Sequence, residues 1–210
     1  MNFFSNAIDY FVRGGICMWP LLVCSILSIV IGCERILYYR KAFSSTDFVE
    51  KFCQLMRELK TEEAMKLAQG AQGNAAKLAE EMLSQDNNKL EGRYESMVYS
   101  KTDRYIDAWE KHIGYLEVII GLSPMLGLLG TITGMINSFN ALNDRMNNPL
   151  AVTAGIGEAL ITTVFGLCIA IMGMLIFAYL DSKLKTGTLN INEVADVLVN
   201  IYEIKHPNKG

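Results

Sequence analysis

One acidic residue stands at the edge of an uncharged apolar stretch in the second half of the chain. Glu158 lies between the sequences "GIG" and "ALITT", and residues 159–180 contain no Asp, Glu, Lys or Arg. A carboxylate within a membrane span is costly and by default marks a route for ions or protons. The alternative is a glutamate at the level of the lipid headgroups, which requires the span to start at residue 159.

Hydroxyl groups inside the apolar segments suit the same chemistry. In residues 118–143, three- and four-residue steps align one small and polar stripe: Pro124, Gly127, Thr131, Gly134 and Ser138, with Gly130 completing a GxxxG pair with Gly134. Such stripes let membrane helices approach closely. Helix packing explains the glycines, but a mid-depth hydroxyl at Thr131 needs a partner or water. After Glu158, Thr162 shares its face at i,i+4 spacing, and Thr163 starts a neighbouring face.

Other kinds of chemistry have no support in the sequence. It contains no nucleophile elbow, no phosphate-binding glycine loop and no paired carboxylates at catalytic spacing, so we predict that it is not an enzyme. The two histidines are isolated and the five cysteines lack metal-ligand spacing, which predicts no metal and no cofactor. A net charge of -3 without a basic run argues against nucleic-acid binding.

Three uncharged blocks dominate the organisation of the 210 residues. They are 16–33, 118–143 and 159–180, and each is long enough for a membrane-spanning helix. We therefore expect an all-α membrane protein with three transmembrane helices and long cytoplasmic helical extensions. Glu117 lies at the cytoplasmic end of the second span and is weaker evidence for an ion pathway than Glu158. Its alternatives are a position at the membrane interface, an ion pair with Lys111 or a contact with a neighbouring subunit.

The distribution of basic residues predicts the orientation. Of the basic residues that flank the ends of the three spans, two lie on one side, Arg13 and Arg145, and eight on the other: Arg35, Arg40, Lys41, Lys101, Arg104, Lys111, Lys183 and Lys185. Since basic residues favour the cytoplasm, the N-terminus is periplasmic and the C-terminus cytoplasmic. The predicted segments are a periplasmic N-terminus 1–15, a first span 16–37, a cytoplasmic helical region 38–112, a second span 113–140, a short periplasmic loop 141–150, a third span 151–180, and a cytoplasmic C-terminal helix and tail 181–210.

Local signals predict several helices in the cytoplasmic parts. Ser45-Thr46, Thr61 and Asn74 are candidate helix starts, and residues 84–90 form the clearest break. No strong break separates residues 91 and 140, which predicts one continuous helix. The "KTGT" sequence at 185–188 predicts a break before a short amphipathic helix at the C-terminus.

Two motifs in succession make the sequence recognisable. "LSPMLGLLGTITGMINSF" followed by "GIGEALITTVFGLCIAI" closely resembles the ExbB/TolQ/MotA family of proton-channel stator proteins. The resemblance is most specific over residues 113–181 and extends to the first span. Three spans favour the ExbB/TolQ branch over the MotA branch. One departure is Thr133, which stands where some relatives have a tryptophan.

The resemblance implies a fold and a mechanism that the spacing does not. The resemblance implies that the chain is a helical subunit of a homopentameric ring. The pore of such a ring holds a single-span partner, ExbD or TolR, and this partner carries an aspartate within the membrane. By motif match, the resemblance implies that Thr131, Thr163 and Glu158 line the ion pathway. Possible supporting residues are Ser138, Thr162 and Glu117. Helical spacing groups Thr162 with Glu158, and we keep Thr162 as a candidate subunit contact. Proton flow would energise a TonB- or TolA-like protein in the bacterial inner membrane.

A second hypothesis needs no ion flow. The chain would then be a passive membrane scaffold that recruits partners through its cytoplasmic helices, which leaves Glu158 and the threonines unexplained. The sequence does not separate the ExbB from the TolQ role, and it does not distinguish H⁺ from Na⁺.

Overall fold

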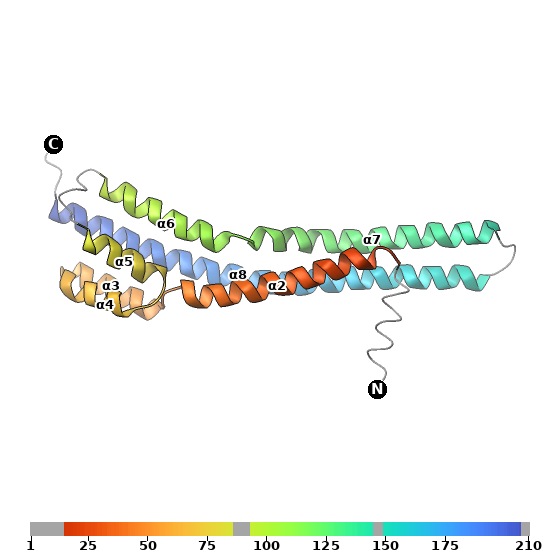
Figure 1. Cartoon of the computed structure of the whole chain (residues 1–210), viewed down its shortest axis with the longest axis horizontal. Helices are drawn as coiled ribbons and strands as arrows, with labels where there is room; N and C mark the ends of the chain where they lie inside the picture. The colour runs from red at the N-terminus through yellow and green to blue at the C-terminus, as the bar shows by residue number, and fades with distance from the viewer. Residues whose placement is uncertain (1–14, 86–92, 145–148, 207–210) are drawn as a thin grey trace, which may run out of the picture. The chain divides into compact units, whose positions relative to one another are not determined.

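The computed structural model describes residues 15–85, 93–144 and 149–206, without the side chains of 141–154 and 158. These residues form helices and no strands (Figure 1). The helices are α2 (Met18–Ala42), α3 (Thr46–Arg57), α4 (Thr61–Gly70), α5 (Asn74–Ser84), α6 (Tyr94–Glu110), α7 (Ile113–Asp144) and α8 (Pro149–Lys205). The predicted all-helical class is confirmed for this part of the chain.

Three helical stretches are long and apolar enough to cross a membrane. They are Met18–Arg57, Tyr94–Asn140 and Gly155–Lys205, and they contain α2, α7 and α8. Their apolar segments coincide with the uncharged blocks of the sequence. The prediction of three candidate spans is therefore confirmed by length and composition.

The chain divides into two compact units. The first unit comprises the described residues up to Cys33 together with His112–Tyr179, and contains the apolar parts of α2, α7 and α8. Met18 and Leu21 of α2 pack there against Ile119 of α7 and Ile169 of α8. A methyl group on Gly32 would lie 2.8 Å from a side-chain carbon of Ile176, so α2 also packs closely on α8.

The second unit comprises Glu34–Lys111 and the described residues from Leu180 onward. It contains the end of α2, all of α3–α6 and the last part of α8. Figure 1 shows α3, α4 and α5 beside the C-terminal part of α8. Large side chains from α3, α5, α6 and α8 fill its core, and those with less than 2 % exposure include Phe52, Met56, Leu78, Met82, Trp109, Ile191 and Leu198.

The helix starts of the second unit follow the local signals in part. Ser45 caps α3, and its Oγ accepts a hydrogen bond from the Phe48 amide at 3.2 Å. α4 begins at Thr61, as predicted. The predicted cap at Asn74 is wrong by one position, because Gly73, with φ of 104°, occupies the N-cap and Asn74 is the first helical residue. α5 ends at Ser84, and residues 86–90 of the predicted break lie outside the described residues.

The prediction of one continuous helix over 91–140 is wrong. α6 ends at Glu110, and His112, with φ of 73°, separates it from α7. The Arg35 guanidinium donates to the carbonyl oxygens of Ala108 at 3.2 Å and Trp109 at 3.4 Å, and the Tyr39 hydroxyl donates to Trp109 at 2.8 Å. In a continuous helix these carbonyls would accept from backbone amides four residues later. Side chains of α2 replace those amides and end the helix.

The prediction of a break at 185–188 is also wrong. α8 continues through this sequence to Lys205. Gly187 is buried, and a methyl group there would lie 2.7 Å from a ring carbon of Phe43. The Phe43 ring is held on both sides, stacked on Tyr39 at 4.6 Å and edge-on to Trp109 at 4.8 Å between ring centroids. The glycine therefore serves close packing inside a helix rather than a turn.

Candidate functional site

Small residues bring α7 and α8 into close contact in the first unit. A methyl group on Gly127 would lie 3.1 Å from both the Thr162 carbonyl oxygen and the Thr163 Cα, and one on Gly166 would lie 2.5 Å from the Ser123 carbonyl oxygen. Larger side chains at these glycines would push the two backbones apart. The predicted packing stripe of α7 thus meets α8 of the same chain, as expected for small residues in membrane helices.

The C-terminal part of the small-residue stripe on α7 continues this contact with α8. A methyl group on Gly134 would lie 2.9 Å from the Ala159 Cβ, and one on Gly155 would lie 3.1 Å from the Ser138 Cβ. Ser138 is buried and its hydroxyl donates to the Gly134 carbonyl at 2.9 Å. Its hydrogen bond is therefore satisfied inside its own helix. Pro124 lies within α7, partly buried, and does not end the helix.

Thr163 forms a hydrogen bond between the two helices. Its hydroxyl donates to the Gly127 carbonyl at 3.1 Å, and the side chain is only partly buried. Sequence spacing placed Thr163 beside the glycine face of α8 but did not predict this bond. The hydroxyl has two lone pairs left as acceptors while its proton is engaged.

Thr162 lies deeper in the same interface. It is 1 % exposed, and a methyl group on Gly130 would lie 2.9 Å from its Cβ. In this structure its packing partner is in its own chain, and the contact buries nearly the whole side chain. Its role as a candidate subunit contact stays a prediction.

Thr131 has a different environment from Thr163. Its hydroxyl donates to the Leu128 carbonyl of its own helix at 2.7 Å, and the side chain is partly exposed. Such back-bonding satisfies the proton locally. Gly127, which binds Thr163, precedes Thr131 by one helical turn, so the two threonines are neighbours along α7 without a direct bond between them in the described contacts.

The exposed Thr133 follows the same local pattern. Its hydroxyl lies 3.0 Å from the carbonyl oxygens of both Leu129 and Gly130 in its own helix. It stands at the position where the resemblance noted a departure. Thr133 is therefore a natural comparison for Thr131, with the same side chain on the same helix.

Glu158 belongs to α8, but its side chain lies outside the described residues. Its neighbour Ala159 is 3 % exposed and faces Gly134 of α7. At about 100° per residue, position 158 and position 163 lie about 140° apart around the helix. The two positions therefore flank the face that packs on α7 from opposite sides, with Thr162 between them.

Glu117 lies in the second turn of α7 and is exposed. Within the part of the chain that the structure describes, it forms no ion pair. Of the alternatives for this residue, an interfacial position or a contact with another subunit stays open. The described residues also contain no cluster of histidine, cysteine or acidic side chains able to hold a metal ion.

Two buried serines in the first unit were missed by sequence reasoning. Ser123 is fully buried and its hydroxyl donates to the Ile119 carbonyl at 2.7 Å; Ser28 of α2 donates to the Cys24 carbonyl at 2.9 Å. A signal for Ser123 existed, because it precedes Gly127 by four residues and extends the stripe by one turn. Ser28 carries no comparable signal in the sequence.

The part of the chain that contains this interface matches a known family. The match covers residues 57–193, more than half of the chain, and includes α7 and the facing part of α8. The chain belongs to the MotA/TolQ/ExbB proton channel family. Membership confirms the resemblance, and the packed parts of α7 and α8 lie within the matched region.

Named relatives place the chain in the ExbB/TolQ branch. It is 33 % identical over 186 residues to biopolymer transport protein ExbB-like 1 of Synechocystis, a match that covers 83 % of this chain and 70 % of the relative. It is 33 % identical over 118 residues to biopolymer transport protein ExbB of Salmonella typhimurium, covering 54 % and 48 %. It is 34 % identical over 82 residues to the Tol-Pal system protein TolQ of Haemophilus influenzae, covering 39 % and 36 %.

Family and structure together support a coarse functional statement. With three helices able to cross a membrane, this member of the ExbB/TolQ branch is a multi-pass inner-membrane protein. It is an ExbB/TolQ-like proton channel subunit.

Proposed function

We propose that this chain is the ring-forming subunit of a motor driven by the proton motive force. With an ExbD/TolR-like single-span partner it forms the proton channel, which energises TonB- or TolA-type envelope transport or maintenance. The observation that carries the proposal is the family match over residues 57–193, which contains the intramembrane threonines. Each charge that crosses 100 mV releases about 2.3 kcal/mol, so a few protons supply useful mechanical work.

Exposed apolar surface supports assembly into a ring. Large side chains on α7 and α8 stay exposed although the two helices already pack together; examples are Met125 at 67 % and Leu128 at 59 % on α7, and Leu160 and Ile171 at 60 % each on α8. Within a membrane such faces contact lipid or further helices. We propose a homopentamer in which part of this surface forms subunit contacts.

The proposed ion pathway runs along Thr131, Glu158 and Thr163. Thr131 supports it best, because its hydroxyl proton is satisfied by Leu128 while the side chain stays partly exposed beside Ile132, itself 45 % exposed. Its free lone pairs can accept a hydrogen bond from water or from a partner. Glu158 would hold a proton or attract cations near the periplasmic end.

A partner is needed because these spans lack a mid-depth carboxyl group. Residues 118–143 and 159–180 contain no acidic or basic side chain. Threonine hydroxyls relay protons by hydrogen bonding but do not store them near neutral pH. The proposal therefore assigns the titrating carboxyl group to the single-span partner.

The proposed orientation places the N-terminus and the 141–150 loop in the periplasm and the C-terminus in the cytoplasm. The excess of basic residues on the opposite side supports it. A cysteine introduced at Asn147 should react with a membrane-impermeant thiol reagent in intact cells, and one at Asn87 should not, once the native cysteines are replaced. Reversed labelling would refute the orientation.

Native mass spectrometry of the detergent-solubilised protein tests the assembly. We expect a homo-oligomer, most simply a pentamer, which retains two copies of a co-expressed single-span partner. Monomers alone, with or without the partner, would contradict the proposal. A stable ring that never supports proton flux would instead favour a passive scaffold.

A further inference from the structure

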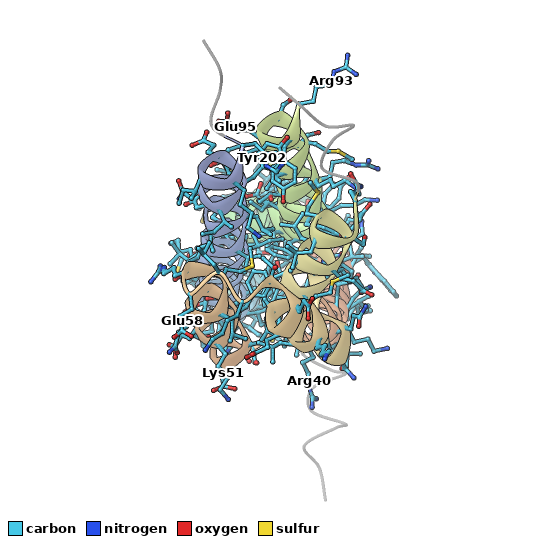
Figure 2. All side chains as sticks on the ribbon, turned by 90° about the vertical axis from the view of Figure 1, so that its left-hand side faces the viewer. Arg40, Lys51, Glu58, Arg93, Glu95 and Tyr202 are labelled. Atoms are coloured by element: carbon cyan, nitrogen blue, oxygen red, sulfur yellow. The ribbon has the colours of Figure 1, made fainter. Side chains whose placement is uncertain are left out.

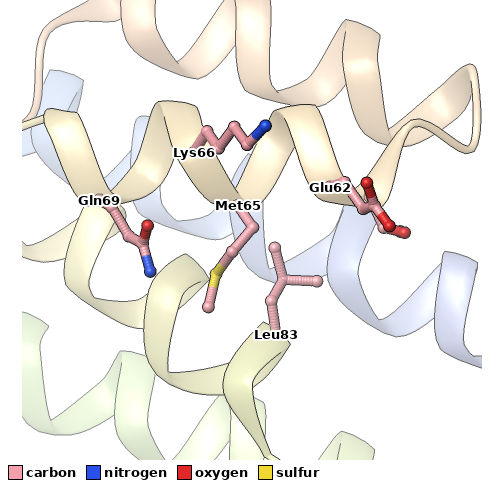
Figure 3. Close-up of a pocket in the computed structure, with 6 residues that line it drawn as sticks. Glu62, Met65, Lys66, Gln69 and Leu83 are labelled. Atoms are coloured by element: carbon pink, nitrogen blue, oxygen red, sulfur yellow. The ribbon is translucent and has the colours of Figure 1, made fainter.

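The open hollow on α4 and α5 receives no ligand assignment. It measures about 410 Å³ and is lined by Thr61, Glu62, Met65, Lys66, Gln69 and Leu83 (Figure 3). None of these side chains is buried, and its charged residues are one acid and one base. The junction between α6 and α7 combines several independent features and carries more.

Two carbonyl groups at the end of α6 accept hydrogen bonds from α2 instead of from their own helix. The Arg35 guanidinium donates to Ala108 and Trp109, and the Tyr39 hydroxyl donates to Trp109. A continuous helix would supply the amides four residues later as donors. Figure 1 shows the break between α6 and α7, whereas α2 and α8 run on without one. The two acceptors can therefore be satisfied in two ways, by side chains of α2 or by the main chain.

The main chain is strained at this break. The helical pattern persists up to the Lys111 amide, which donates to the Asp107 carbonyl at 3.1 Å. His112 then adopts φ of 73°, in the left-handed region, which is unfavourable for a residue with a side chain. Residues 106–113 contain neither glycine nor proline. The local sequence does not require the break, so the donors from α2 hold it.

Trp109 bears a second cost of this arrangement. Its side chain is 1 % exposed, and among the residues that the structure describes its Nε1 is the only buried side-chain nitrogen or oxygen without a hydrogen-bond partner. The indole meets the Phe43 ring edge-on, at 4.8 Å between centroids. An unpaired buried donor is unfavourable. Local costs of this kind concentrate in segments that have a second arrangement.

Arg35 can leave the α6 carbonyls without becoming an unpaired charge. Its Nε and Nη2 donate to the Glu34 carboxylate at 2.6 and 2.7 Å, and its guanidinium lies 4.8 Å from the centre of the Tyr38 ring. Both partners lie on α2 itself, and the bonds to the carbonyls come from Nη1. The contact between α2 and α6 is therefore separable from the contacts that hold the arginine.

The junction coincides with the border between the two units. The chain crosses this border after Cys33, after Lys111 and after Tyr179. α2 and α8 continue through their crossings as helices, whereas the crossing after Lys111 is the break between α6 and α7. Arg35 is the second residue after the first crossing. A change at the junction therefore alters the interrupted connection between the unit that contains the apolar spans and the helices of the second unit.

We propose that the α6–α7 junction is a two-state joint, held in its broken form by Arg35 and Tyr39 and able to close into one continuous helix. Closing returns both carbonyls to main-chain amides and gives His112 right-handed backbone angles. The guanidinium keeps its pair with Glu34. The joint goes beyond the proposed proton pathway, because it controls how motion in the first unit reaches the helices of the second.

Amide hydrogen exchange on the full chain in detergent, resolved to single amides, tests the joint. Ile113 is the first residue of α7, and in the closed form its amide would donate to the Trp109 carbonyl. Arg35→Gln should slow exchange at Ile113 about tenfold, because the broken form falls to roughly one tenth of the population. A mere loss of stability would act in the opposite direction and make exchange faster.

Arg40→Gln is the matched control. Arg40 is an exposed arginine on the same helix (Figure 2), and its replacement should leave exchange at Ile113 unchanged. The measurement needs neither the single-span partner nor proton flux, so a failure of the joint and a failure of the proposed function are distinguishable.

A change at His112 tests the strain directly. Glycine tolerates φ of 73°, so adding His112→Gly to Arg35→Gln should return exchange at Ile113 towards the wild-type rate. Should Arg35→Gln fail to fold, Tyr39→Phe keeps the ring that stacks on Phe43 and should slow the same amide about threefold. Unchanged or faster exchange at Ile113 in the folded variant, or slow exchange that persists after His112→Gly, would overturn the proposal.

Discussion

The two intramembrane threonines should separate stability from proton transfer. Thr163→Val removes the 3.1 Å hydrogen bond to the Gly127 carbonyl on the other helix. Interhelical hydrogen bonds in membranes contribute about 0.6 kcal/mol on average and up to about 1.7 kcal/mol. Thr131→Val removes only a bond to Leu128 in its own helix, whose carbonyl keeps its backbone partner. We therefore expect a lower unfolding temperature for Thr163→Val and little change for Thr131→Val.

Proton flux should respond differently from stability. In liposomes that contain the partner, Thr131→Val should reduce flux to the level of the partner-free ring although the complex stays stable. Thr133→Val is the matched control, because Thr133 forms the same kind of bond within its own helix and is not assigned to the pathway. Normal flux in Thr131→Val, or equal loss in Thr133→Val, would refute the assignment. A destabilisation by Thr131→Val as large as by Thr163→Val would refute the structural reasoning.

Three further predictions concern packing, capping and pH. Gly166→Ala should destabilise the first unit by about 1–3 kcal/mol, since its methyl group would lie 2.5 Å from a backbone oxygen. Gly121→Ala is the control, because a methyl group there meets open space. Equal unfolding temperatures for the two variants would contradict this prediction. Arg35→Gln should lower the free energy of unfolding by about 1.5–3 kcal/mol, because it removes the hydrogen bonds from the guanidinium to the carbonyl groups at the end of α6. Arg40 is exposed, so Arg40→Gln should leave the unfolding temperature unchanged in the same thermal melt (Figure 2). Burial raises the pKa of the Cys53 thiol from its ordinary value of 9.0 to about 11. Between pH 9 and 11 the thiol ionises in the unfolded chain but not in the folded one, so the free energy of unfolding should fall by about 1.4 kcal/mol per pH unit. Denaturant titrations of Cys53→Ala that show the same fall would exclude this cause.

The sequence predicted the elements whose signals are local or compositional. Uncharged blocks identified the three spans, and the serine at position 45 identified a helix start because a capping hydroxyl acts within three residues. The small-residue stripe was recognisable for a similar reason, since a fixed spacing on a helix places its members on one face. These features depend on neighbours in the chain and not on the fold.

The features that were missed depend on residues distant in the sequence. The end of α6 results from Arg35 and Tyr39, more than 60 residues away, which take over its terminal carbonyls. Gly187 stays helical because the Phe43 ring occupies the space of a side chain. The hydrogen bond from Thr163 to Gly127 likewise depends on which face of α8 meets α7, and spacing alone does not decide that.

Partner-dependent proton flux in liposomes, compared between the wild type, Glu158→Asp and Glu158→Ala, tests the central claim most directly. A pull-down of the complex with its single-span partner confirms assembly in each sample. The account predicts flux only with the partner, part of it retained in Glu158→Asp and none above background in Glu158→Ala. Flux of wild-type size in an assembled Glu158→Ala complex, or no flux from the assembled wild type, would contradict it.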